Sequence, residues 1–148
     1  MNGHLVIREV VHGSAEYWAI VGLRDLVLRQ PLGLRFSAAE LEAERSWRHF
    51  ACYCDDVLAA CLALCPLEHG VIRMRQVAVA PDMQRQGIGR ALVEYAEVWA
   101  RQAGYCHMVL HARETAVAFY EALGYLTVGA RFEEVTISHW AMEKRLTD

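Results

Sequence analysis

The chain has 148 residues, of which 55% are hydrophobic and 22% charged, and its formal net charge is −3. This length and apolar content predict one domain with a single core over residues 1–148. The slightly acidic balance argues against nucleic acid and anionic membranes as partners. Its apolar runs are shorter than the roughly 20 residues of a membrane span, and residues 1–10 lack a signal-peptide pattern. We therefore expect a soluble, cytoplasmic protein.

Four of the five cysteines lie in apolar, strand-like sequence, which favours reduced thiols packed as small hydrophobes. The alternative is a metal site built from Cys52, Cys54, Cys61 and Cys65. Their Cys-x-Cys and Cys-x3-Cys spacings differ from the Cys-x2-Cys spacing of a structural zinc site. We therefore predict no metal.

The chain opens with a predicted strand over residues 5–10, followed by a helix. Ser14 is a suitable N-cap for this helix, which runs toward Leu28 before Gln30 and Pro31 stop it. We expect its inward face to include Trp18, Val21 and Leu26.

A second, short helix and a hairpin follow. Ser37 and Glu40 form the pattern of a capping box, which predicts a helix over 38–45. Two apolar runs, 47–53 and 57–64, flank the turn residues Asp55 and Asp56 and predict an antiparallel hairpin. A third strand is expected after the Pro66 turn, over residues 71–80.

The second half of the chain alternates helices and strands. Helices are predicted over 89–103 and 115–123, and strands over 105–111, 125–130 and 136–144. Strict strand-helix-strand alternation is confined to the middle of the chain. We therefore predict a mixed α/β fold with a mostly antiparallel central sheet of six to seven strands and helices on both faces.

A polar segment with two glycines, residues 84–91, separates the strand over 71–80 from the next helix; we call it the glycine turn. Backbone N–H groups at the start of a helix face outward at the positive end of its dipole, which suits a phosphate. Gly87 and Gly89 allow unusual dihedrals and close approach of an anion. No Lys-Ser or Lys-Thr follows, so the turn is not a Walker loop, and it comes too late in the chain for a dinucleotide fingerprint.

Two segments carry a resemblance to a known family. Gln84-x-x-Gly87-x-Gly89 follows a Val-Ala-Val-x-Pro strand end, and residues 118–125 read Ala-Phe-Tyr-Glu-Ala-Leu-Gly-Tyr. In this order they resemble the GNAT superfamily of acyl-coenzyme A-dependent N-acetyltransferases, with its Gln/Arg-x-x-Gly-x-Gly/Ala and Phe-Tyr-x-x-x-Gly-Phe/Tyr patterns. The resemblance is tight from about residue 71 to residue 125.

The resemblance implies that acetyl-coenzyme A is the acyl donor. Its pyrophosphate would be held mostly by backbone N–H groups of Gln84, Arg85, Gln86, Gly87, Ile88, Gly89, Arg90 and Ala91. Its pantetheine arm would pair with the strand at Val77, Ala78 and Val79. Further cofactor contacts map onto Glu114, Phe119 and Tyr120, although many family members have asparagine where this chain has Glu114. Arg85 and Arg90 add positive charge, or are ordinary solvated arginines.

The reaction implied is attack of a neutral amine on the thioester, which needs a base for the amine and an acid for the departing thiolate. By resemblance the acid is Tyr120, since a phenol with a pKa of about 10 is protonated at neutral pH; the alternative is that this tyrosine only packs. The usual glutamate of the preceding strand is missing here, so the base is left open. His111 and His139 are the candidates, against purely structural roles.

The leading hypothesis is therefore an N-acetyltransferase that acts on a primary amine of a small molecule or a protein. A non-catalytic acyl-coenzyme A sensor is the alternative, because the usual base is missing. A structural domain in which the glycine turn only caps a helix is the third. An exposed C-terminal edge strand would allow a homodimer.

Overall fold

The computed structural model describes residues 3–147, which fall into two compact units. Unit 1 holds residues 3–65 and 76–96, and unit 2 holds residues 66–75 and 97–147. Strand β4 (Val71–Val79) and helix α3 (Ile88–Gln102) each contribute residues to both units. A single domain over residues 1–148 stays a prediction.

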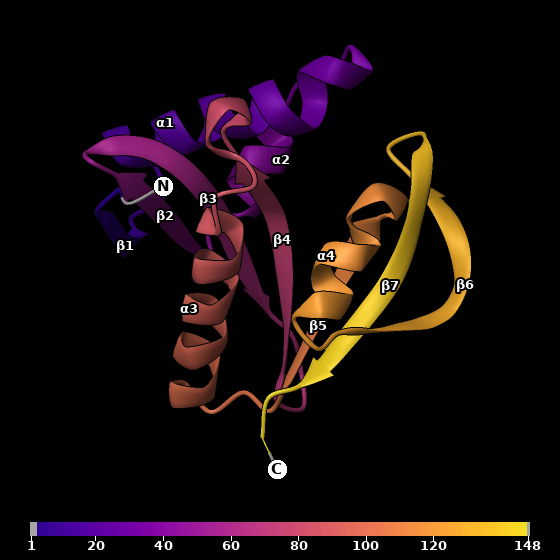
Figure 1. Ribbon diagram of the computed structural model, residues 1–148. Coiled ribbons are helices and arrows are strands. Elements are labelled where there is room, and N and C mark those ends of the chain that lie inside the picture. The colour runs from indigo at the N-terminus through magenta and orange to yellow at the C-terminus, as the bar shows by residue number, and fades with distance from the viewer. Residues whose placement is uncertain (1–2, 148) are drawn as a thin grey trace. The chain divides into compact units, whose positions relative to one another are not determined.

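Unit 1 contains the N-terminal strands and helices (Figure 1). Its elements are β1 (Leu5–Val10), α1 (Ala15–Arg24), α2 (Ala38–Ala43), β2 (Arg48–Cys54) and β3 (Val57–Pro66). β1 pairs antiparallel with β2, and β2 with β3. The predicted order of elements in this half of the chain is confirmed.

Helix α1 begins as predicted, because Ser14 Oγ accepts the N–H of Tyr17 at 3.1 Å. The predicted inward face was wrong at two positions, since Trp18 is 53% and Leu26 is 47% exposed. The buried positions include Tyr17, Ile20, Val21, Leu23 and Arg24. Because the charged residue Arg24 occupies one of the buried positions, the apolar residues alone do not show the helical period in the sequence. A π-helical turn over Asp25–Arg29 then changes the phase, which leaves Leu26 outside.

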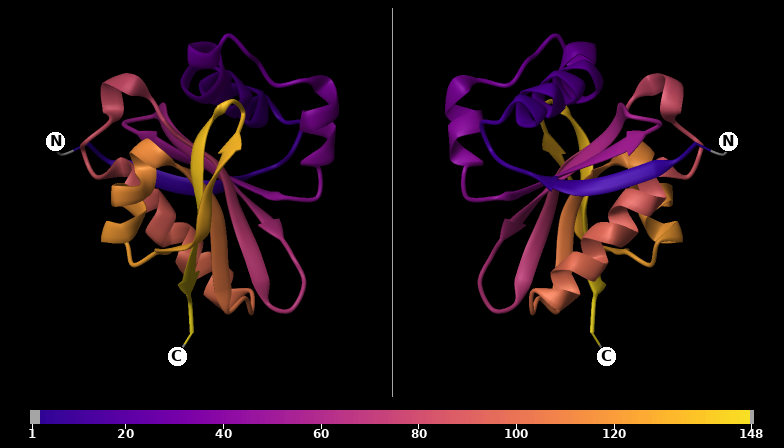
Figure 2. Two further views of the ribbon diagram at one scale, coloured as in Figure 1. Left: turned by 90° about the vertical axis from the view of Figure 1, so that its right-hand side faces the viewer. Right: turned by 90° about the vertical axis from the view of Figure 1, so that its left-hand side faces the viewer.

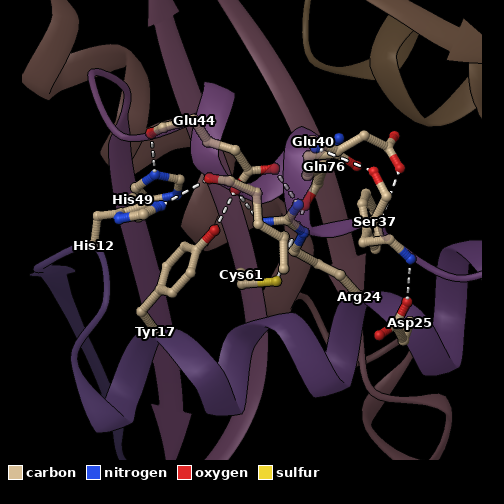
Figure 3. Close-up of polar contacts among 12 residues, drawn as sticks. His12, Tyr17, Arg24, Asp25, Ser37, Glu40, Glu44, His49, Cys61 and Gln76 are labelled. Atoms are coloured by element: carbon tan, nitrogen blue, oxygen red, sulfur yellow. Dashed lines mark hydrogen bonds and ion pairs between the residues drawn. The ribbon is translucent and has the colours of Figure 1, made fainter.

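A buried polar cluster joins α1 to the end of α2 and to β2 (Figure 3). The Arg24 guanidinium donates to both carboxylate oxygens of Glu44, and each of the two side chains is only 1% exposed. The Tyr17 hydroxyl donates to Glu44 Oε1 at 2.8 Å. His49 Nε2 lies 3.0 Å from the Glu44 carbonyl oxygen, to which it donates. A buried carboxylate is tolerable only when it is paired and hydrogen-bonded in this way.

Helix α2 has the predicted capping box. Glu40 N–H donates to Ser37 Oγ at 3.1 Å, and Ser37 N–H donates to Glu40 Oε1 at 3.0 Å. Arg29 adds an ion pair to Glu40 at 2.9 Å. The arginine and the cap lower the pKa of Glu40 to about 2.

The five cysteines form no disulfide in residues 3–147, and they differ in burial. Cys52, Cys54 and Cys61 are buried in the two central strands of unit 1. Burial raises the pKa of Cys52 to about 11 and that of Cys61 to about 12. Cys65 and Cys106 are half-buried.

Unit 2 contains β5 (His107–Arg113), α4 (Val117–Ala122), β6 (Leu126–Glu134) and β7 (Ile137–Arg145). β6 and β7 form a curved hairpin, drawn in yellow-orange in Figure 1 and seen from the side in Figure 2. The pairing of this hairpin is interrupted: Val128 faces Ala141, whereas the next pair is Phe132 with His139. A bulge therefore inserts two extra residues into β6.

The strand order along the sheet is β1-β2-β3-β4-β5-β7-β6. β4 pairs in parallel with β5, and β7 pairs antiparallel with both β5 and β6. The predicted mixed α/β fold with a central sheet of up to seven strands is confirmed. Among residues 3–147, no helix is long and apolar enough to cross a membrane.

The buried ion pair predicts a large stability loss in Arg24→Met, because this change leaves the Glu44 carboxylate buried without its cation. We expect the free energy of unfolding to fall by about 3–5 kcal/mol, measured by urea denaturation. The control is Arg45→Met, because Arg45 pairs with Glu42 on the surface and its loss should change little. Equal effects of the two variants would contradict this account of the cluster.

Candidate functional site

The backbone of the glycine turn enters the left-handed region at two of its residues. Arg85 has φ 63° and Gly87 has φ 81°, and both lie in the left-handed region. For a residue with a side chain, such as Arg85, this conformation costs on the order of 1 kcal/mol. Such strain is typical of functional sites, where the surrounding structure maintains it.

The turn leads directly into the N-terminus of α3. Ala91 N–H donates to the Gly87 carbonyl at 3.0 Å, which is the first helical hydrogen bond. The amides of Ile88, Gly89 and Arg90 therefore lie ahead of the helical ladder. Residues 84–87 are exposed, and the first turn of α3 carries no acidic side chain. This arrangement suits a bound anion.

Side chains of the glycine turn shape the loop more than they add charge. Gln84 Nε2 donates to the Val79 carbonyl at 3.1 Å, and Gln86 Nε2 to the Asp82 carbonyl at 3.4 Å. Arg90 forms an ion pair with Glu94 at 3.4 Å, whereas Arg85 is exposed. Arg85 is therefore better placed than Arg90 to add charge to an anion site.

The end of β4 precedes the turn. Ala78 is 2% exposed and packs in the core of unit 1, while Val77 and Val79 are half-buried. Gln76, with φ 56°, kinks the strand just before them. Because the Ala78 side chain packs in the core, this residue can contact a ligand only through its backbone.

In unit 2, Tyr120 differs from three other tyrosines of the chain. The hydroxyls of Tyr17, Tyr53 and Tyr125 donate to the carboxylates of Glu44, Glu16 and Glu97. Within the described residues, no group hydrogen-bonds the hydroxyl of Tyr120, whose ring packs against Phe119 and Tyr125. Burial raises the pKa of Tyr120, which keeps the phenol protonated at neutral pH.

The two histidines named from the sequence come together in unit 2 around a carboxylate. His111 Nδ1 lies 2.9 Å from Glu134 Oε1, and His139 Nε2 lies 3.8 Å from Glu134 Oε2. Arg73 Nη2 lies 2.6 Å from the same His111 Nδ1. Partial burial alone would raise the pKa of Glu134, but the hydrogen bond from His111 and the nearby charges lower it overall.

The two histidines differ in exposure. The side chain of His139 is 5% exposed, and its Nδ1 donates to the Ile137 carbonyl at 2.9 Å. The side chain of His111 is 32% exposed. Of the two, His111 is the one that a substrate can approach.

The two remaining cofactor candidates of unit 2, Glu114 and Phe119, differ in their contacts. Glu114 forms an ion pair with Arg131 at 3.6 Å and accepts from Trp140 Nε1 at 3.5 Å, so its charge is directed to neighbours. Phe119 is 38% exposed and offers apolar surface beside Tyr120.

Sequence reasoning missed Glu134. Its place beside the histidines depends on the order of the last strands, in which β7 lies between β5 and β6, and on the bulge in β6. The only signal in the sequence was a carboxylate five residues before His139, across a short turn.

Comparisons with known proteins agree with this geometry. The family model for acetyltransferases of the GNAT type matches residues 17–125. A candidate N-acetyltransferase from Lactobacillus plantarum has a crystal structure that superimposes with a TM-score of 0.83 at 28% identity, over 97% of this chain and 99% of that one. An aminoglycoside 6'-N-acetyltransferase complexed with coenzyme A gives a TM-score of 0.80 over 97% of this chain and 98% of that one; at 18% identity it shows the shared fold alone.

The fold and the matched segments thus define an acetyltransferase domain. The chain belongs to the acetyltransferase (GNAT) family. The predicted family and enzyme class are confirmed. Among curated relatives, Probable N-acetyltransferase 14 of Xenopus tropicalis is 28% identical over 115 residues, which cover 74% of this chain and 55% of that protein. The chain spans about half or less of the length of the curated relatives it matches.

Proposed function

We propose that this chain transfers an acetyl group from acetyl-coenzyme A to a primary amine of a small molecule or a protein. The observation that carries the proposal is the strained, exposed glycine turn at the start of α3, in a chain that belongs to the GNAT family.

The glycine turn binds the pyrophosphate through the backbone N–H groups of residues 84–90, with Arg85 adding charge. The N–H of Ala91, which was also predicted to bind, is instead used in the first helical hydrogen bond. The pantetheine arm pairs with the backbone of residues 77–79. The exposed ring of Phe119 adds an apolar contact, and Glu114 remains tied to its own neighbours. Bound in this way, acetyl-coenzyme A presents a thioester carbonyl as the electrophile.

Tyr120 is the general acid, because its hydroxyl is uncommitted and protonated. The base takes one proton from the ammonium form of the acceptor. The neutral nitrogen then bonds to the acetyl carbon, the carbon–sulfur bond breaks, and the thiolate takes the phenol proton. The proton still to leave the new amide nitrogen returns to the tyrosinate, so that the enzyme is restored after one proton is released to solvent.

Replacing Gly87 by Glu should weaken donor binding, since the change sets a negative side chain at the proposed anion site. By titration calorimetry we expect wild-type protein to bind acetyl-coenzyme A. Gly87→Glu should bind at least about tenfold more weakly, a loss of roughly 1.4 kcal/mol.

Gly33→Glu is the matched control for this titration. Gly33 lies in the same unit and has φ 71°, and an added Cβ would meet nothing within 4 Å at either glycine. The backbone strain and the added charge are therefore alike in the two variants. If both variants bind acetyl-coenzyme A equally weakly, the cause is backbone strain and not the loss of the anion site. Absence of binding in the wild type would remove the donor site altogether.

Replacing Tyr120 by Phe should lower kcat by about 10²–10⁴-fold, the usual contribution of a general acid. Affinity for acetyl-coenzyme A should change little, as judged by the same titration. The control is Tyr125→Phe. The Tyr125 hydroxyl donates to buried Glu97, so its removal should lower stability rather than kcat. Unchanged turnover in Tyr120→Phe would remove the acid assignment.

The sensor alternative makes a different prediction for the same protein. It requires donor binding without acetylation of any amine in a broad panel of polyamines, amino sugars and peptide N-termini. An exposed proton acceptor beside a carboxylate, such as His111 with Glu134, favours the enzyme.

A further inference from the structure

The side chains around His111 share one face of the sheet in unit 2. His139 pairs with Arg113, two residues after His111, and Arg73 pairs with Val109, two residues before it. Because residues two apart in a strand point to the same face, these three positions lie on one face. Figure 1 shows the strands concerned, β4, β5 and β7.

The β6 bulge brings a carboxylate to this face. Phe132 pairs with His139, and Glu134 follows two residues later on the same side. In an uninterrupted ladder from Val128 and Ala141, the partner of His139 would instead be residue 130. The insertion of two residues keeps the alternation of faces while it advances Glu134 toward the histidines.

His111 Nδ1 has two competing partners. It lies 2.6 Å from Arg73 Nη2, which can only donate, and 2.9 Å from Glu134 Oε1, which as a carboxylate can only accept. One ring nitrogen cannot accept from the arginine and donate to the carboxylate at the same time. The choice between these partners therefore sets which nitrogen of the neutral ring carries the hydrogen.

This choice decides whether His111 can act as a base. If Nδ1–H donates to Glu134, the lone pair is on Nε2, for which the described residues provide no hydrogen-bond partner, and the ring is 32% exposed. If Nδ1 accepts from Arg73, the hydrogen is on Nε2, and the exposed nitrogen can no longer take a proton. Arg73 is held beside Glu134 in either case, at 3.8 Å.

We propose that Glu134 is a positioning residue that holds His111 as the Nδ1–H tautomer, so that His111 Nε2 is the proton acceptor for the amine substrate. This proposal rests on the proposed acetyltransferase function. In the reaction, Nε2 takes one proton from the ammonium nitrogen, and the resulting imidazolium is stabilised by the Glu134 carboxylate. It later releases that proton to solvent. His139 fills the other side of the carboxylate and stays buried.

The tautomer can be measured without any substrate. Long-range proton–nitrogen NMR spectra of ¹⁵N-histidine-labelled protein at pH 8 distinguish the two neutral forms, and His111→Gln identifies the signal. We expect the Nδ1–H form in the wild type and the Nε2–H form in Glu134→Gln, where Arg73 becomes the stronger partner. The double variant Glu134→Gln/Arg73→Met should return to Nδ1–H, because the competing donor is gone and the Gln amide oxygen still accepts.

An Nε2–H ring in the wild type, or the same tautomer in wild type and Glu134→Gln, would overturn the proposal. With an amine that the protein acetylates, kcat should fall by about 10²-fold in Glu134→Gln. Part of the loss should be recovered in the double variant, an outcome that a merely structural role would not give. If no amine is acetylated, the proposed function fails, while the spectra still decide the role of Glu134.

Discussion

The buried ion pair between Arg24 and Glu44 is the interaction on which the rest of unit 1 depends. It joins the end of α1 to the residue after α2, at positions where each side chain is 1% exposed. Two charges taken out of water are tolerable only if each is paired, so neither helix can shift without leaving one charge uncompensated. Tyr17 and His49 hold the same glutamate and extend the constraint to β2.

Glu44 and Glu134 differ in how deeply their carboxylates are buried. Glu44 accepts from an arginine and a tyrosine and has no exposed surface to offer a substrate. Glu134 is 36% exposed and lies 2.9 Å from Nδ1 of the partly exposed His111. The carboxylate of Glu44 therefore maintains structure, whereas the carboxylate of Glu134 is available to support proton transfer.

Local signals in the sequence predicted most of the fold. The Ser37 capping box, the aspartate hairpin and the glycine turn each depend on residues close together in the chain, and so could be recognised there. The inward face of α1 could not, because a buried arginine occupies an apolar position. Glu134 could not either, since its neighbours are set by strand order and by a bulge, which are tertiary features.

The uneven burial of the cysteines makes two of them usable as native chemical handles. The thiols of Cys52 and Cys61 stay protonated at mildly alkaline pH, since burial raises their pKa values to about 11 and about 12, and Cys54 is buried beside them. Maleimides and disulfide reagents attack the thiolate, so they will select the half-buried Cys65 and Cys106. One of these lies in each unit. A fluorophore on the unaltered sequence would therefore report on unit 1 through Cys65 and on unit 2 through Cys106.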